Sequence, residues 1–71
     1  MPSRILPLAA MDKIMRKAGA PRVSDGAKEA LASLLEREGI KISEKAIMYS
    51  QHAGRKTVTA ADITLGGNHE R

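Results

Sequence analysis

Basic and hydroxyl side chains gather in two short segments of this 71-residue chain, residues 19–23 (GAPRV) and 54–58 (GRKTV). Cationic and hydroxyl side chains are common donors to the phosphate oxygens of a duplex, and helix N-termini assist them. The formal net charge of +4 and the pI near 9.9 also favour an anionic partner, either nucleic acid or a membrane surface. The candidates in these segments are Arg22, Arg55, Lys56 and Thr57.

Chemistry other than binding has little support in the sequence. The chain has no cysteine, which excludes a disulfide and a thiolate metal site. His52 and His69 lack the spacing of metal ligands, and neither has the acidic and nucleophilic neighbours of a catalytic group. His52 also fits the last turn of a helix, where a basic residue suits the helix dipole. We therefore expect no catalytic residue, no metal site and no cofactor, and a chain that is not an enzyme.

The longest predicted helix lies between Ser24 and Gly54. Ser24 is a good N-cap, because its hydroxyl can accept a hydrogen bond from an unpaired backbone N–H group. Asp25 follows in the first turn, where a carboxylate suits the positive end of the helix dipole. Gly54 can adopt the left-handed conformation that commonly follows the last turn of a helix.

Two short helices flank the long one. Apolar residues at helical spacing predict an amphipathic helix over Leu8–Ala18. Thr59 and Asp62 have the spacing of a capping box, which predicts a brief helix over Ala60–Leu65 that two glycines end. The chain is therefore expected to be all-α, with three parts: an N-terminal tail over residues 1–7, a helical domain over residues 8–65 and a short C-terminal tail over residues 66–71.

The long helix is too long for a chain of this size. About 29 residues give a rod of roughly 43 Å, whereas a compact chain of this length has a diameter of about 30 Å. Either the helix breaks near Gly39, which would give a four-helix monomer, or a second chain covers its apolar residues. Small size, a single aromatic residue (Tyr49) and the absence of cysteine favour oligomerisation.

A pair of chains would bring the two basic segments together. If two long helices cross antiparallel, the first loop of one chain lies beside the second loop of its partner. Arg22 then lies near the partner's Lys56 and Thr57. Two such loop pairs and the paired helix N-termini give three anion-binding points, whose spread suits double-stranded DNA. Lys13 and Arg16, on the first helix, add to this surface or belong to a solvated face.

Hydropathy gives an expectation about location. No apolar run approaches the roughly 20 residues that a membrane-spanning helix needs, and the N-terminal residues do not form a signal peptide. We therefore expect a soluble, cytoplasmic protein.

Three motifs resemble the histone fold, and most closely the tailless archaeal histones: RVSD from Arg22 to Asp25, HAGRKT from His52 to Thr57, and A-x-D-I from Ala60 to Ile63. The match extends from about Leu6 to Leu65. The resemblance implies an antiparallel handshake homodimer that assembles further on DNA. It implies an architectural protein that wraps and compacts DNA with little sequence specificity, associated with the nucleoid.

The resemblance also implies roles for individual residues. Arg22 matches the arginine that histones insert into the minor groove. Lys56 and Thr57 match phosphate contacts, and Lys13 matches a basic position that faces DNA. Arg55 matches a partner of Asp62 in an ion pair within the chain. The residues expected where one dimer meets the next are Tyr49, His52, Asp62 and Leu65.

The chain departs from the archaeal histone pattern at its third helix. Gly66 and Gly67 replace a further helical turn, and the positions that form ion pairs between stacked layers hold residues that cannot form them. These positions predict weaker stacking into long fibres. A second function therefore stays open, in which the chain is a histone-fold subunit of a transcription-type complex that pairs with a different chain.

Overall fold

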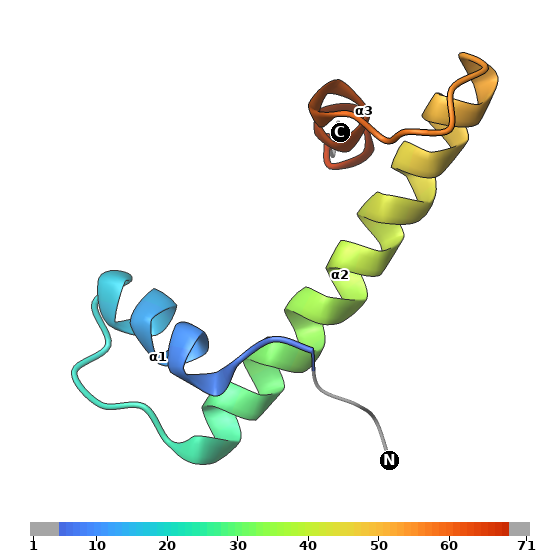
Figure 1. Ribbon diagram of the computed structural model, residues 1–71. Coiled ribbons are helices and arrows are strands. Elements are labelled where there is room, and N and C mark those ends of the chain that lie inside the picture. Colours follow the sequence, from blue (N-terminus) through green and yellow to red (C-terminus); the bar gives the residue numbers. More distant parts are fainter. Residues whose placement is uncertain (1–4, 69–71) are drawn as a thin grey trace. The chain divides into compact units, whose positions relative to one another are not determined.

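Three helices make up the chain in the order short, long, short (Figure 1). The computed structural model describes residues 5–68, which contain no β-strand. The helices are α1 (Leu8–Lys17), α2 (Asp25–His52) and α3 (Ala60–Gly66). They form two compact units that divide within α2, the first ending at Arg37 and the second beginning at Glu38. The all-α class and the three predicted helices are confirmed, and residues 1–4 and 69–71 of the predicted tails lie outside the described residues.

The first unit combines α1 with the first part of α2. Pro7 precedes α1 in an extended conformation, and its carbonyl accepts the N–H of Ala10. Met11 of α1 and Ala32 of α2 are the buried apolar residues of this unit, 2% and 0% exposed. Each is a single point of contact, so the described part of this unit has a very small core of its own.

The ends of α2 follow the signals in the sequence. The Ser24 hydroxyl accepts the N–H of Ala27 at 3.1 Å, which is an N-cap bond. Gly54 has a φ of +73°, the left-handed conformation that glycine adopts without strain. Gly39 lies inside α2 and does not end it. The four-helix alternative is therefore wrong, because one glycine costs a helix only about 1 kcal/mol.

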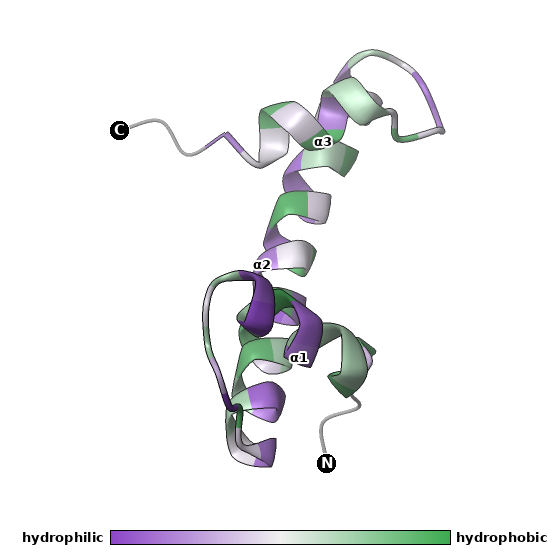
Figure 2. Cartoon of the chain, turned by 90° about the vertical axis from the view of Figure 1, so that its left-hand side faces the viewer, coloured by the Kyte–Doolittle hydropathy of each residue, from purple (hydrophilic) through white to green (hydrophobic). Residues whose placement is uncertain are grey.

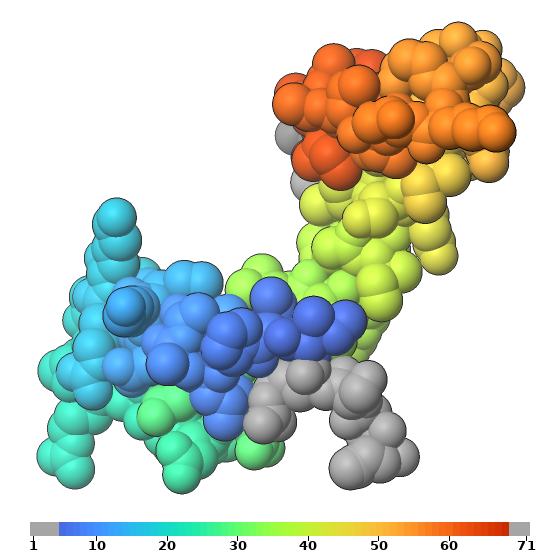
Figure 3. Space-filling view, in the orientation of Figure 1, coloured from blue at the N-terminus to red at the C-terminus, as the bar shows by residue number. Residues whose placement is uncertain are grey.

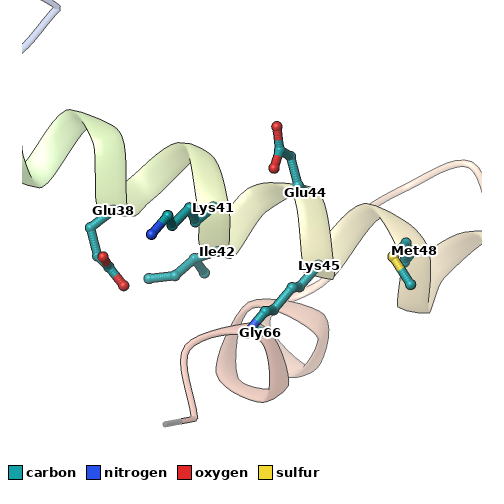
Figure 4. A pocket seen from close by; sticks show the side chains of 7 residues that line it. All are labelled: Glu38, Lys41, Ile42, Glu44, Lys45, Met48 and Gly66. Atoms are coloured by element: carbon teal, nitrogen blue, oxygen red, sulfur yellow. The ribbon is translucent and has the colours of Figure 1, made fainter.

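The second unit combines the rest of α2 with α3. Gly66 was expected to end α3, but it is the last residue of the helix and Gly67 is its C-cap. Gly66 is buried, and a Cβ built on it would lie 2.7 Å from the carbonyl oxygen of Ile42. The missing side chain lets α3 approach α2 closely beside Ile42 and Lys45 (Figure 4). The glycine is therefore required for helix packing, and ends no helix.

Most of the large apolar side chains are exposed. Hydrophobic segments recur along the whole of α2, interleaved with hydrophilic ones (Figure 2). Within the described residues, the buried apolar side chains are those of Met11, Ala32 and Ala46. The exposed large hydrophobic residues include Ile14, Leu34, Leu35, Ile40, Ile47, Met48, Tyr49, Val58, Ile63 and Leu65.

The glycine contact gives a test of helix packing. Gly66→Ala is expected to destabilise the protein by about 1–3 kcal/mol, since the new methyl group forces α3 away from the α2 backbone. Gly67→Ala is the matched control, because its Cβ would lie 3.4 Å from its nearest neighbour, the Ile63 carbonyl oxygen. Thermal unfolding of the two variants at one protein concentration measures the difference. Equal melting temperatures would contradict this account of Gly66.

Candidate nucleic-acid interface

The first loop carries Arg22 at the surface. It leaves α1 through Gly19, whose φ of +115° lies in the left-handed region. The N–H of Gly19 donates to the Arg16 carbonyl and that of Ala20 to the Met15 carbonyl, both at 3.0 Å, which closes the end of the helix. In the space-filling view the loop, in cyan, lies at the surface (Figure 3). Arg22 is exposed within this loop, as is Lys13 on α1.

Arg16 has two partners within the first unit. Its Nε donates to Oδ2 of Asp12 at 2.9 Å, and its Nη1 donates to the carbonyl oxygen of Pro21 at 3.2 Å. The side chain is 53% exposed. Arg16 was expected to be a DNA contact, but in this structure its guanidinium links α1 to the first loop.

An ion pair brings Arg55 and Asp62 together in the second unit. Nη1 of Arg55 donates to Oδ2 of Asp62, and Nη2 donates to Oδ1, both at 3.0 Å. Nη1 also donates to the Thr57 carbonyl at 2.9 Å. The Asp62 side chain is 3% exposed, whereas that of Arg55 is 40% exposed. A two-pronged pair with one buried member fixes the second loop against α3.

The Asp62 carboxylate also caps α3. It accepts the backbone N–H of Thr59 at 2.8 Å and the Thr59 hydroxyl at 3.1 Å, while the Thr59 hydroxyl accepts the N–H of Asp62 at 3.4 Å. The Arg55 guanidinium and then the Thr59 N–H hold the pKa of this carboxyl well below its ordinary value, although burial acts in the opposite direction. Asp62 is therefore charged at neutral pH, and its role within the chain is structural.

Ser50 is a part of this site that the sequence analysis missed. It is 2% exposed, and its hydroxyl donates to the Arg55 carbonyl at 3.3 Å, while the Arg55 N–H donates to the Ser50 carbonyl at 2.9 Å. These two bonds fix the start of the second loop. The available signal was a small polar residue four positions after Ala46, on the apolar face of the helix.

The remaining expected residues lie at the surface. Lys56 and Thr57 are exposed in the second loop, and His52 is exposed at the end of α2. Tyr49 is 39% exposed and Leu65 is 53% exposed. Of the four residues expected between dimers, Asp62 alone is buried within its own chain.

Other kinds of site have little basis in residues 5–68. This part of the chain holds no group of three or more histidine or acidic side chains placed to bind a metal ion. None of its helices is long and apolar enough to cross a membrane. The second unit has an open groove of about 580 Å³ beside α3, lined by Glu38, Lys41, Ile42, Glu44, Lys45, Met48 and Gly66 (Figure 4).

The Asp62 interactions predict how acid affects folding. A carboxyl group whose pKa is lowered by folding stabilises the protein above its ordinary pKa, and this contribution is lost as the pH falls. Asp62→Asn is therefore expected to lower the melting temperature by several degrees at neutral pH. The difference from the wild type should narrow as the pH falls below about 4. Thermal unfolding between neutral pH and about pH 2 measures it.

The control for this experiment is Asp25→Asn, since the Asp25 side chain is 92% exposed beside Lys28. Exposed ion pairs contribute little to stability, so this variant should keep the wild-type loss of stability in acid. A constant difference between Asp62→Asn and the wild type at every pH would contradict the role given to the charged carboxylate.

Comparison with known proteins identifies the family. Residues 4–66 match the family described as histone-like transcription factor (CBF/NF-Y) and archaeal histone. The chain is 52% identical over 60 residues to a subunit of the archaeal histone HAN1 from Thermococcus zilligii, covering 84% of this chain and 90% of the relative. It is 41% identical over 58 residues to probable archaeal histone 3 of Methanocaldococcus jannaschii, covering 82% and 87%.

These matches confirm the histone fold expected from the sequence. They also confirm the prediction of an architectural DNA-binding protein of chromatin rather than an enzyme. The family match covers most of the chain, including all three helices and both loops. The chain therefore belongs to the family of histone-like transcription factors and archaeal histones.

Proposed function

We propose that this protein wraps and compacts double-stranded DNA as a homodimer, with little sequence specificity, and that it acts in the nucleoid. The observation that carries the proposal is that each unit holds a loop fixed by an arginine–aspartate pair and bearing exposed cationic or hydroxyl side chains. Arg22 is exposed in the first loop, and Lys56 and Thr57 in the second. The fixed loops limit the conformational entropy that is lost when these side chains bind phosphates.

Dimer formation follows from the exposed apolar surface. A chain of this size buries only about 60% of the surface that it exposes when unfolded. Many large apolar side chains of the described residues are exposed, including Leu34 at 55% and Ile40 at 52%. A second copy supplies the missing cover, because the same apolar residues on both chains can pack across a two-fold axis. The groove beside α3, with Ile42 and Met48 in its lining, is part of the surface to be covered.

The DNA surface then comes from both chains. In the antiparallel handshake dimer, the first loop of one chain lies beside the second loop of its partner. Arg22 enters the minor groove, while Lys56 and Thr57 bind the neighbouring phosphates. Lys13 extends this surface along α1, and the N-termini of the helices add partial positive charge. Contacts to phosphates carry no sequence information, which accounts for low specificity.

Dimers assemble further on DNA through Tyr49, His52 and Leu65. All three side chains are exposed in the described chain, and two of them are large and apolar enough to form the centre of a contact. Asp62 contributes less directly, because its side chain is 3% exposed and bound to Arg55. The end of α3 at Gly66 and the absence of stacking ion pairs limit this assembly to short stacks.

A second candidate is pairing with a different histone-fold chain. The relative from Thermococcus zilligii is named as one subunit of a histone, which favours a two-chain assembly for that protein. In this alternative the exposed apolar surface is covered by another polypeptide, and the pure chain binds DNA only weakly. Self-association of the pure chain separates the two candidates.

Nuclease digestion of the pure protein reconstituted on long random-sequence duplex tests the proposed function. We expect a short ladder of protected fragments with a constant step, since each added dimer protects the same length of DNA. Sedimentation of the same preparation without DNA should give a dimer. A monomer that protects no DNA would contradict the proposal and favour pairing with a different chain.

Substitution of Arg22 tests the DNA surface. Arg22→Ala is expected to weaken binding to all duplex sequences alike, because the variant no longer neutralises the phosphates that Arg22 binds. The slope of log affinity against log salt concentration should fall by about 0.9 for each phosphate that is no longer neutralised. Arg22→Lys is the matched control, as it keeps the charge and should keep most of the slope. Titration of labelled duplexes at several salt concentrations measures both, and weakening confined to some sequences would contradict non-specific binding.

A further inference from the structure

Asp12, Arg16 and Pro21 form a bridge between α1 and the first loop. The guanidinium of Arg16 donates from Nε to the Asp12 carboxylate at 2.9 Å and from Nη1 to the Pro21 carbonyl at 3.2 Å. Pro21 immediately precedes Arg22 in the chain. A bond to this carbonyl therefore acts on the peptide unit from which the Arg22 backbone continues.

The second loop has a bridge of the same composition. Arg55 binds the Asp62 carboxylate and donates to the Thr57 carbonyl at 2.9 Å. Thr57 immediately follows Lys56. In each unit, one arginine thus joins a helix carboxylate to a loop carbonyl next to an exposed cation.

We propose that Asp12 and Arg16 are positioning residues for DNA binding, and that they hold the first loop in the conformation that presents Arg22. This inference rests on the proposed function, because it assigns Arg22 a DNA contact. It gives Arg16 a role different from the direct phosphate contact expected from the sequence. Arg16 acts through Arg22.

The chemistry of the bridge favours this role for Arg16. The guanidinium group has several N–H donors in a fixed plane, so one side chain can bind two acceptors in different directions. A lysine ammonium is a compact charge and does not reproduce this geometry. The Asp12 carboxylate also offsets the charge of Arg16, which makes Arg16 a weaker attractor of phosphate than Arg22.

Removal of Asp12 separates positioning from direct contact, because the two roles predict opposite signs. If Arg16 binds phosphate directly, Asp12→Ala removes a negative charge and frees the cation, so DNA binding tightens. If the bridge positions Arg22, the same variant weakens binding by at least about twofold, the smallest coupling usual between residues of one network. Equal or tighter binding by Asp12→Ala would overturn the inference.

Glu29→Ala is the matched control. Glu29 is an exposed acidic residue on α2 in the same unit, and the described residues include no hydrogen-bonding or ion-pair partner for it. It changes the net charge by the same amount as Asp12→Ala, and both variants place alanine within a helix. The control is expected to bind DNA as tightly as the wild type or more tightly.

Two further variants test the route through Arg22. Arg16→Lys keeps the charge and is expected to weaken binding, whereas wild-type affinity would overturn the inference. In an Arg22→Ala background, Asp12→Ala should have no further effect on affinity, because the residue that it positions is gone. An undiminished effect in that background would show that Asp12 acts by another route and would also overturn the inference.

Folding and the proposed function are checked in the same experiments. An exposed ion pair adds little to stability, so Asp12→Ala should melt within a few degrees of the wild type. Affinities are compared at a temperature where both proteins are folded. Failure of the wild-type protein to bind random-sequence duplex would contradict the proposed function, whereas wild-type binding with no weakening in Asp12→Ala contradicts the positioning role alone.

Discussion

Shortage of apolar cover is the constraint on which the rest of this structure depends. A chain of 71 residues devotes 28 of them to one helix, and within the described residues only Met11, Ala32 and Ala46 are buried apolar side chains. Neither unit has a core of the size that usually stabilises a domain. The family's paired arrangement meets this constraint, because association supplies the apolar burial that a single short chain lacks. Folding and assembly are then parts of one equilibrium.

Polar interactions within the chain have a different task, which is to fix the loops. The described hydrogen bonds of Arg55, Asp62, Thr59 and Ser50 converge on the second loop and the start of α3. A loop with few apolar contacts would otherwise sample many conformations. Local bonds of this kind form within one chain, so the loops can be ordered before a partner or DNA is bound.

The sequence predicted the helices well because their signals are local. Ser24, Gly54 and the pair Thr59 and Asp62 act within a few residues, and each has the expected conformation or bond. Gly66 was misinterpreted because its role depends on Ile42, which is distant in the sequence. The two partners of Arg16 were missed for a related reason. Asp12 lies four residues before it, a spacing that favours an ion pair, but the Pro21 carbonyl is placed by the turn at Gly19.

The two arginine–aspartate pairs differ in depth, and depth determines how each responds to salt. The Asp62 side chain is 3% exposed, whereas that of Asp12 is 26% exposed. Salt screens exposed charges strongly and buried charges much less. The second loop therefore keeps its conformation over a wide range of ionic strength. In the first loop, added salt acts on the phosphate contacts of Arg22 and on the bridge that presents it. The salt dependence of binding then has two sources in one loop, a consequence of placing the Asp12 carboxylate nearer the solvent.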